Sequence, residues 1–249
     1  MLLLTDFDGT LRDLNDSTVL SSNLAAVQRW RAAGNEACLI TGRNFSVLSQ
    51  ILPEWKNYFS FLATDNGGAI FDYQGDLIAT YPLSENIIEE ILTVIPHDIL
   101  PVYYYPDHYS TTLRPKSRLI KLRLWFHDLD ELWSKHHYFE ANIFKLKSLP
   151  WPKHSFSPLP GVDLSNYCGF IDLVPPTSGK EIAAQRLSGI LSFPHSEIIA
   201  VGDDYNDIPI LEAFKSYAIS SAPPEVICAA SGRTITSISA LISQEMSPI

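Results

Sequence analysis

Four short apolar segments are each followed directly by polar residues, and this pattern constrains the fold more than any other feature of the chain. Apolar runs of this length predict buried strands; they lie at 2–4, 37–40, 59–63 and 198–201. Stretches with apolar residues at helical spacing separate the first three, and this alternation predicts a parallel sheet with helices on both faces. The carboxyl ends of such strands share one edge, where ligands bind. The polar residues after the strands are therefore expected to converge there.

Helix-breaking and capping residues set the expected boundaries of the elements. Ser21 or Ser22 is expected to begin the first helix, and Gly34 to end it. The residues Asn66-Gly67-Gly68 predict a hairpin turn into a further apolar strand. In the last part of the chain we expect helices that begin at Lys180 and cover 208–214 and 224–230, and a last strand over 217–219.

The regular alternation stops near residue 82 and resumes near residue 175, which predicts an inserted α+β module. Within it we expect helices over 84–95 and 128–140, and strands over 102–105, 120–126, 143–146 and 170–174. Residues 148–168 are rich in proline and serine, which predicts a long surface loop. We therefore assign residues 1–81 and 175–249 to a doubly wound, parallel-sheet, Rossmann-like α/β core domain, and residues 82–174 to a second domain.

Acidic pairs follow two of the predicted strands. Asp6 and Asp8 stand two positions apart after the first strand, and Asp203 and Asp207 follow the strand at 198–201. Carboxylates held this close repel each other, so a divalent cation is the expected compensation. One carboxylate then remains free to act as a nucleophile.

Polar side chains at the other strand ends fit a phosphate ligand. Thr41 and Asn66 follow the second and third strands, and Lys180 begins a helix that the topology brings nearby. Chance would scatter such groups between both edges of the sheet, whereas all of these are expected at one edge. The sequence therefore predicts a combined phosphate and metal site. A second interpretation of Thr41 is that it caps the helix that follows.

The composition limits the partners of the chain. Its 249 residues carry 18 lysines and arginines against 28 aspartates and glutamates, a formal net charge of −10. Nucleic acid is not an expected partner, because a phosphate backbone requires a basic surface. A small phosphorylated molecule is the expected partner. No apolar run approaches the ~18 residues of a membrane span, and the three cysteines lack metal-ligand spacing. We expect a cytoplasmic monomer or small homo-oligomer without membrane contact.

Four motifs of the chain resemble those of the haloacid dehalogenase superfamily of phosphatases. Asp6-Phe7-Asp8-Gly9-Thr10 is similar to the first motif, Leu39-Ile40-Thr41-Gly42-Arg43 to the second, Lys180 to the third, and the run from Gly202 to Asp207 to the fourth. The insertion resembles the type-two cap of the Cof-like, sugar-phosphate phosphatase branch. The resemblance spans the chain and implies a Mg²⁺-dependent phosphatase whose cap domain covers 82–174.

The resemblance also implies a role for each acidic residue. Asp6 is expected to attack phosphorus and form an aspartyl-phosphate, and Asp8 to act as general acid and base. Mg²⁺ is expected to bind Asp6, the backbone carbonyl of Asp8, and Asp203, with Asp207 supporting the metal. Lys180 is expected to neutralise the negative charge at Asp6 and on the phosphoryl group.

Binding of phosphate or substrate is expected from a second group of residues, namely Thr41, Gly42, Arg43, Asn66, Lys180 and Asn206. The resemblance implies that the Thr41 hydroxyl donates to a phosphoryl oxygen and that Asn206 orients the carboxylates. Arg43 has two interpretations, contact with the substrate or pairing with an acidic side chain.

The reaction that these residues favour is hydrolysis of a small phosphorylated metabolite, with a sugar phosphate as the expected substrate class. A phosphomutase, which returns the phosphoryl group to a sugar, is the first alternative, and steady release of phosphate distinguishes it from a hydrolase. The second alternative is a non-catalytic binding or regulatory module of the same fold. Mg²⁺-dependent thermal protection without phosphate release would identify such a module.

Overall fold

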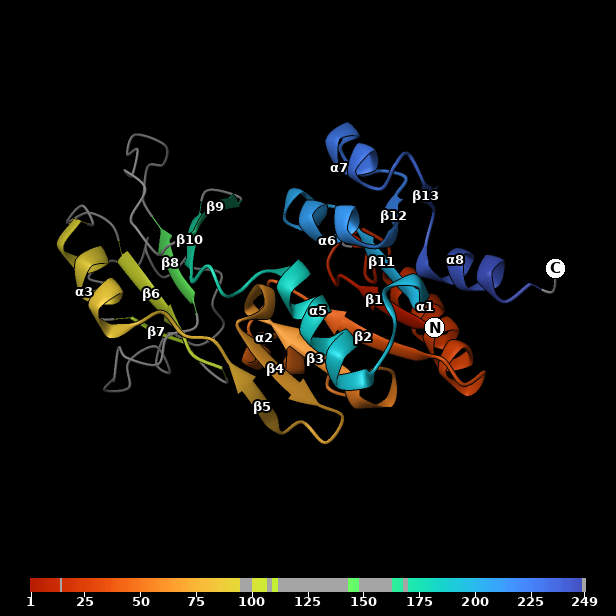
Figure 1. Ribbon diagram of the computed structural model, residues 1–249, viewed down its shortest axis with the longest axis horizontal. Helices are drawn as coiled ribbons and strands as arrows, with labels where there is room; N and C mark the ends of the chain where they lie inside the picture. The colour runs from red at the N-terminus through yellow and green to blue at the C-terminus, as the bar shows by residue number, and fades with distance from the viewer. Residues whose placement is uncertain are drawn as a thin grey trace.

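The computed structural model describes residues 1–13, 15–94, 100–106, 109–111, 143–147, 163–167 and 170–247. Their strands form two separate sheets, one of eight strands and one of five (Figure 1). The chain passes between the sheets twice, once from β5 to α3 and once from β10 to α5 (Figure 1). We propose that the larger unit, 1–81 with 175–249, is the core domain and that 82–174 is the inserted cap domain.

The larger sheet has the strand order β13-β12-β11-β1-β2-β3-β4-β5. Six strands are parallel, and β4 and β5 are antiparallel additions at one edge. The strand bounds are β1 Leu2–Thr5, β2 Glu36–Ile40, β3 Phe61–Thr64, β4 Ala69–Asp72, β5 Leu77–Thr80, β11 Ile198–Gly202, β12 Lys215–Ile219 and β13 Thr234–Ile235. The predicted hairpin at Asn66 is confirmed, because β3 and β4 pair on either side of it.

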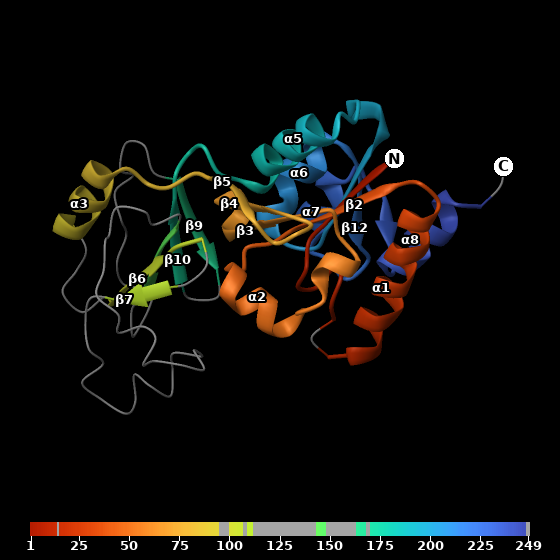
Figure 2. The ribbon, with the colours of Figure 1, turned by 90° about the horizontal axis from the view of Figure 1, so that it is seen from below.

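Helices cover both faces of the larger sheet (Figure 2). They are α1 Ser17–Ala32, α2 Phe45–Ile51 and α8 Ile238–Glu245 on one face, and α5 Lys180–Leu191 and α6 Ile208–Ala213 on the other, with α7 Pro224–Ala229 beside α6. Side chains of a strand alternate between its faces: Leu3 packs in the cluster of Trp30, whereas Leu2 and Leu4 pack in that of Leu187. This confirms the predicted doubly wound α/β fold.

The smaller sheet is antiparallel and has the order β7-β6-β8-β10-β9. Its strands are β6 Leu100–Tyr104, β7 Tyr109–Thr111, β8 Ile143–Lys147, β9 Asp163–Tyr167 and β10 Phe170–Val174, and α3 Glu85–Val94 precedes them. The prediction of a loop throughout 148–168 is wrong over β9, whose polar residues lack an apolar pattern because β9 is an edge strand. The predicted strand at 120–126 and helix at 128–140 lie outside the described residues.

The first helix begins earlier than the sequence predicted. Asp16, and neither Ser21 nor Ser22, is its N-cap: the Asp16 carboxylate accepts a hydrogen bond from the backbone N–H of Thr18 at 2.9 Å. A carboxylate is favoured at this position by the helix dipole as well as by the hydrogen bond. Gly34 follows the helix end with φ +84°, as its predicted role as terminator requires.

A buried asparagine connects the loop after β1 to the C-terminal helix. The Asn23 amide donates to the carbonyl of Leu11 at 2.9 Å, and its oxygen accepts from the backbone N–H of Ser239 at 2.9 Å. Replacing Asn23 with alanine leaves both backbone groups unpaired, so we expect the free energy of unfolding to fall by ~1–3 kcal/mol in a urea titration. The exposed Asn57→Ala is the matched control and should change it by less than ~0.5 kcal/mol.

No helix in the described part of the chain combines the length and the apolar character that a membrane span requires.

Candidate active site

The loops after β1 and β11 meet at the carboxyl edge of the larger sheet. The two strands are parallel neighbours in which Thr5 pairs with Val201, and the backbone N–H of Asp6 donates to the carbonyl of Val201 at 3.1 Å. Asp6, Asp203 and Asp207 each offer a carboxylate oxygen, and these oxygens lie within 4.8 Å of one another. The acidic groups from the two ends of the sequence therefore form one cluster.

Lys180 joins two carboxylates of this cluster and is 3% exposed. As the first residue of α5, it extends Nζ to 2.7 Å from Oδ1 of Asp6 and to 2.6 Å from Oδ1 of Asp207. Burial alone would lower the pKa of Lys180, but the carboxylates of Asp207 and Asp6 overcome it and hold that pKa above its usual range. Lys180 is therefore a fixed positive charge between two carboxylates.

Asp207 holds the loop after β11 in place. Its Oδ2 accepts from the backbone N–H groups of Asp203 at 3.0 Å and Asp204 at 3.2 Å, while its Oδ1 accepts from Lys180. A Cβ atom at Gly202 would lie 2.4 Å from Cγ of Asp207, so only glycine fits there. Both oxygens of Asp207 have partners within the protein, which suits a supporting role beside a metal better than direct ligation.

Asp203 is held by the turn that follows the first strand. The Thr10 hydroxyl donates to its Oδ1 at 2.6 Å. Gly9, at φ +83°, approaches so closely that a Cβ atom there would lie 1.9 Å from Oδ2 of Asp203. Gly9 is thus required both for its backbone conformation and for this contact.

Two carboxyl groups of the cluster bind protons more tightly than usual. Burial raises the pKa of Asp6 to about 8; Asp207 and Asp203 act in the same direction, and Lys180 opposes them. Burial also raises the pKa of Asp203 to about 6, against the hydrogen bond from Thr10. A cation that binds here must therefore displace protons at neutral pH.

Asp8 lies outside the cluster, paired with Arg43. The Nη2 of Arg43 donates to Oδ1 of Asp8 at 2.9 Å, and its Nε donates to Oδ2, so the pairing is bidentate. Arg12 adds a weaker contact, with Nη1 at 3.9 Å from Oδ1. In the structure, therefore, Arg43 pairs with an acidic side chain, as the second of its two interpretations predicted.

The loop after β2, which carries Thr41 and Arg43, is joined by hydrogen bonds to the turn after β3. Thr41 is buried, and its carbonyl accepts from the backbone N–H of Asn66 at 2.9 Å, while the carbonyl of Arg43 accepts from that of Asp65 at 3.0 Å. Asp65 and Asn66 both have positive φ, 54° and 55°, and such residues persist only where surrounding contacts fix them.

Thr41 does not cap α2, contrary to the alternative interpretation, because the N-cap is Asn44.

Asn66 lies between the second and fourth motifs. Its Oδ1 accepts from Nδ2 of the exposed Asn206 at 3.4 Å, and a Cβ atom at Gly42 would lie 3.1 Å from the same oxygen. The structure therefore joins the predicted site residues in two groups: Asp6, Lys180, Asp203 and Asp207 in the acidic cluster, and Thr41, Gly42, Asn66 and Asn206 beside it.

Sequence reasoning gave no role to three residues that support this site, Thr10, Asn44 and Asp65. Thr10 positions Asp203, and Asn44 connects Asp65 to the loop of Arg43. An asparagine two residues before a serine, at the start of an apolar helical pattern, is a helix-cap signal that could have identified Asn44. Nothing in the local sequence marks its contact with Asp65.

Fold and site together define an open α/β protein with a cluster of three carboxylates and a buried lysine at the carboxyl edge of its sheet. A family model described as haloacid dehalogenase-like hydrolase matches residues 3–156 and 162–240. The chain belongs to this family, as the motifs predicted.

Relatives of the chain include proteins named as phosphatases. The 5-amino-6-(5-phospho-D-ribitylamino)uracil phosphatase YbjI of Escherichia coli is 26% identical over 93% of this chain and 89% of its own length. A haloacid dehalogenase-like hydrolase from Bacteroides thetaiotaomicron has a TM-score of 0.77 at 17% identity, covering 98% of this chain and 99% of that one. A sugar phosphatase of HAD subclass IIB has a TM-score of 0.73 at 18% identity, covering 98% and 95%. These two structures share the fold of this chain.

Proposed function

We propose that this protein is a Mg²⁺-dependent phosphatase that hydrolyses a small phosphate monoester, of the sugar-phosphate class, through an aspartyl-phosphate. The observation that carries the proposal is the placement of Asp6: its buried carboxylate lies 2.7 Å from the Lys180 ammonium and shares a cluster with Asp203. A carboxylate that attacks a phosphate dianion meets strong repulsion, and positive charge at this position removes it.

The donor set fits Mg²⁺. It consists of oxygen atoms alone, which a hard cation prefers, and Asp203 keeps Oδ2 without a partner among the described hydrogen bonds. Asp6, Asp203 and the backbone carbonyl of Asp8 are the groups that would hold the ion, with Asp207 orienting the loop. When bound, the ion supplies positive charge that stabilises negative charge on the phosphoryl oxygens.

The residues of the chain divide the reaction into two displacements. An oxygen of Asp6 forms a bond to phosphorus while the bond to the leaving oxygen breaks; Asp8 enters this step protonated, with one of its two contacts to Arg43 released, and donates its proton to the leaving oxygen. Asp8 then accepts a proton from water, which attacks phosphorus, releases phosphate and restores the Asp6 carboxylate. Thr41, Lys180 and the loop of Asn66 bind the phosphoryl oxygens.

The names of the relatives support the substrate class. The relative from Escherichia coli is named for a phosphate ester on a ribityl chain, and a structural neighbour is named a sugar phosphatase. A screen of sugar phosphates, nucleotides, pyridoxal phosphate and phosphoglycolate, with and without Mg²⁺, tests the proposal. Release of inorganic phosphate supports a hydrolase; transfer between positions of a sugar without release would identify a phosphomutase instead.

Mg²⁺ is expected to raise the melting temperature more at about pH 8 than at about pH 5. The folded-state pKa of Asp6, about 8, lies above its ordinary value of 3.8, so the fold favours the protonated group. This contribution to stability is complete below about pH 4 and is lost as the pH rises towards about 8. Near pH 8, therefore, fewer protons compete with Mg²⁺ for the carboxylate oxygens of Asp6.

Differential scanning fluorimetry at both pH values measures this shift. Asp203→Asn should reduce it at both, because one charged ligand is lost. Equal shifts at the two pH values, unaffected by Asp203→Asn, would place the cation elsewhere on the protein.

A further inference from the structure

A buried asparagine joins the cap to the loop that carries Arg43. Asn44 is 2% exposed and directly follows Arg43. Its Oδ1 accepts from the backbone N–H of Ser46 at 3.1 Å and from the Ser46 hydroxyl at 2.8 Å. Its Nδ2 donates to Oδ2 of Asp65 at 3.1 Å and to the backbone carbonyl of Tyr105 at 2.6 Å. The amide thus uses both of its donors and both of its acceptor positions.

The contact with Tyr105 reaches across from the smaller sheet. Tyr105 directly follows β6 and is buried, as is Tyr104 before it. A buried N–H donor without a partner is costly. The second N–H of Asn44 therefore favours the arrangement in which the Tyr105 carbonyl lies against the core.

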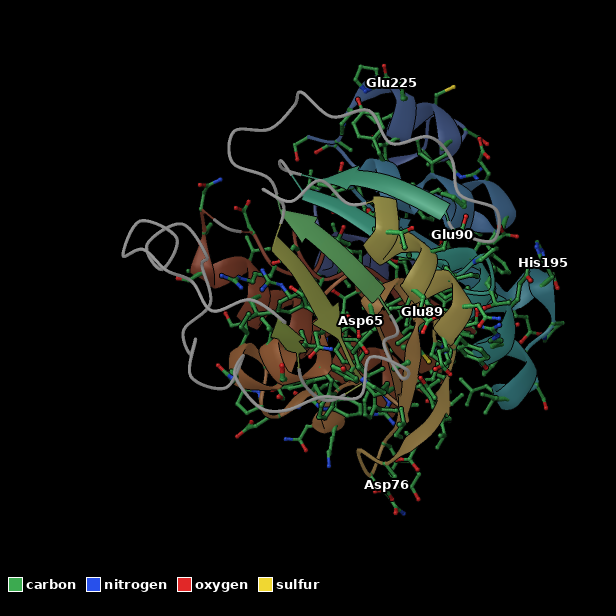
Figure 3. All side chains as sticks on the ribbon, turned by 90° about the vertical axis from the view of Figure 1, so that its left-hand side faces the viewer. Asp65, Asp76, Glu89, Glu90, His195 and Glu225 are labelled. Atoms are coloured by element: carbon green, nitrogen blue, oxygen red, sulfur yellow. The ribbon has the colours of Figure 1, made fainter. Side chains whose placement is uncertain are left out.

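The other N–H of Asn44 acts on the core side. It fixes the carboxylate of Asp65, whose own backbone N–H donates to the carbonyl of Arg43 at 3.0 Å. The Arg43 guanidinium in turn holds both oxygens of Asp8. Figure 3 views the molecule from the side of the smaller sheet, and Asp65, which lies on the core side of this network, is near the centre of that view.

We propose that Asn44 is a positioning residue that couples docking of the cap to the placement of Arg43 on Asp8. When the Tyr105 carbonyl is in place, both Asn44 donors are satisfied, and the backbone that carries Arg43 is fixed through Asp65. When the cap segment leaves, one donor of Asn44 loses its partner, and the loop of Arg43 loses part of its support. The catalytic consequence rests on the proposed phosphatase function; the structural coupling does not.

Asn44→Asp separates this role from helix capping. Aspartate has the same shape, keeps the acceptor for Ser46 and is a good N-cap, but it removes both N–H donors and faces Asp65 and the Tyr105 carbonyl with negative charge. Ser46→Ala is the control, since it removes a contact on the capping side alone. Asn44→Ser, which retains a capping oxygen but is too short to span both partners, serves if the aspartate variant does not fold.

Hydrogen exchange of the whole protein tests the coupling without reference to activity. In Asn44→Asp we expect exchange to accelerate by about tenfold or more in 100–105 and, together with it, at the amides of Asp65 and Asn66. Ser46→Ala should leave both segments at the parent rate. Acceleration in only one of the two segments, or in neither, overturns the coupling.

Turnover of p-nitrophenyl phosphate tests the catalytic consequence. Asn44→Asp should lower kcat by about tenfold or more with a smaller change in KM, because the loss concerns placement of Asp8 rather than binding of phosphate. Parent kcat in Asn44→Asp, with exchange accelerated as expected, overturns the positioning role. If the parent protein releases no phosphate, the proposed function fails, and the exchange result still decides the coupling.

Discussion

Replacing Asp6 with asparagine is expected to abolish phosphate release, with kcat falling by on the order of 10⁴-fold or more. An amide oxygen is a poor nucleophile and cannot form the aspartyl-phosphate. The variant should still fold, because asparagine resembles the protonated carboxyl that burial already favours at this position, where the pKa is about 8. A colorimetric phosphate assay at saturating Mg²⁺ measures the loss, and circular dichroism checks the fold.

Asp76→Asn is the matched control for this substitution. Asp76 is exposed and lies at the rim in Figure 3, in the turn between the edge strands β4 and β5, whereas the cluster follows the central strands β1 and β11, so the same chemical change should leave kcat unaltered. Phosphate release by Asp6→Asn at the parent rate would show that Asp6 is not the nucleophile, and the mechanism would then need another attacking group.

The sequence was sufficient to predict the centre of the core because the strands β1, β2, β3 and β11 are buried on both faces. The strand Leu2–Thr5 is buried throughout and begins with three leucines, so it stands out from its surroundings, and the polar residues after it mark the functional edge. The convergence of Asp6 with Asp203 follows from topology alone: parallel strands that are neighbours end side by side. For these buried strands, the local sequence pattern and the fold of the whole sheet specify the same structure.

Features that depend on a few long-range contacts were not predictable in this way. The strands β9 and β13 are short or polar edge strands, so no apolar pattern announces them. The pairing of Thr10 with Asp203 spans 193 positions in the sequence, and that of Asn44 with Tyr105 spans 61. Hydrogen bonds of this kind are set by the packed structure, whereas turn and cap preferences are local.

Arg43 likewise combines a location that the sequence predicts with a contact that it does not predict. Its place in the loop after the second strand predicts that it lies at the site, and it does lie there, against Asp8. Which carboxylate such an arginine meets depends on residues distant in the sequence, and Asp8 lies 35 positions away. The planar guanidinium of Arg43 matches both oxygens of Asp8, which a pattern in the local sequence does not reveal.

The other large effect concerns the buried lysine. Lys180→Met keeps a side chain of similar length and removes the charge, which leaves the buried Asp207 without its charged partner and Asp6 without the ammonium that favours its charged form. Breaking a buried ion pair by removing one partner costs ~3–5 kcal/mol, so we expect the metal-free variant to lose about that much stability in a urea titration. Its kcat should fall by ~10²–10³-fold, because one positive charge that stabilises the phosphoryl oxygens is gone.

Lys215→Met makes the same change at the surface and is the control for Lys180→Met. Lys215 pairs with Glu245 at 2.8 Å, a distance close to those of Lys180, but its side chain is 43% exposed. Exposed pairs are screened by water and contribute at most ~1 kcal/mol, so this variant should keep the activity and nearly all the stability of the parent. Mg²⁺ should restore part of the stability lost in Lys180→Met and none in Lys215→Met, since the cation places positive charge beside Asp6. If the two variants instead lost equal stability, burial would not set the energy of the Lys180 cluster, and the electrostatic basis proposed for attack by Asp6 would be wrong.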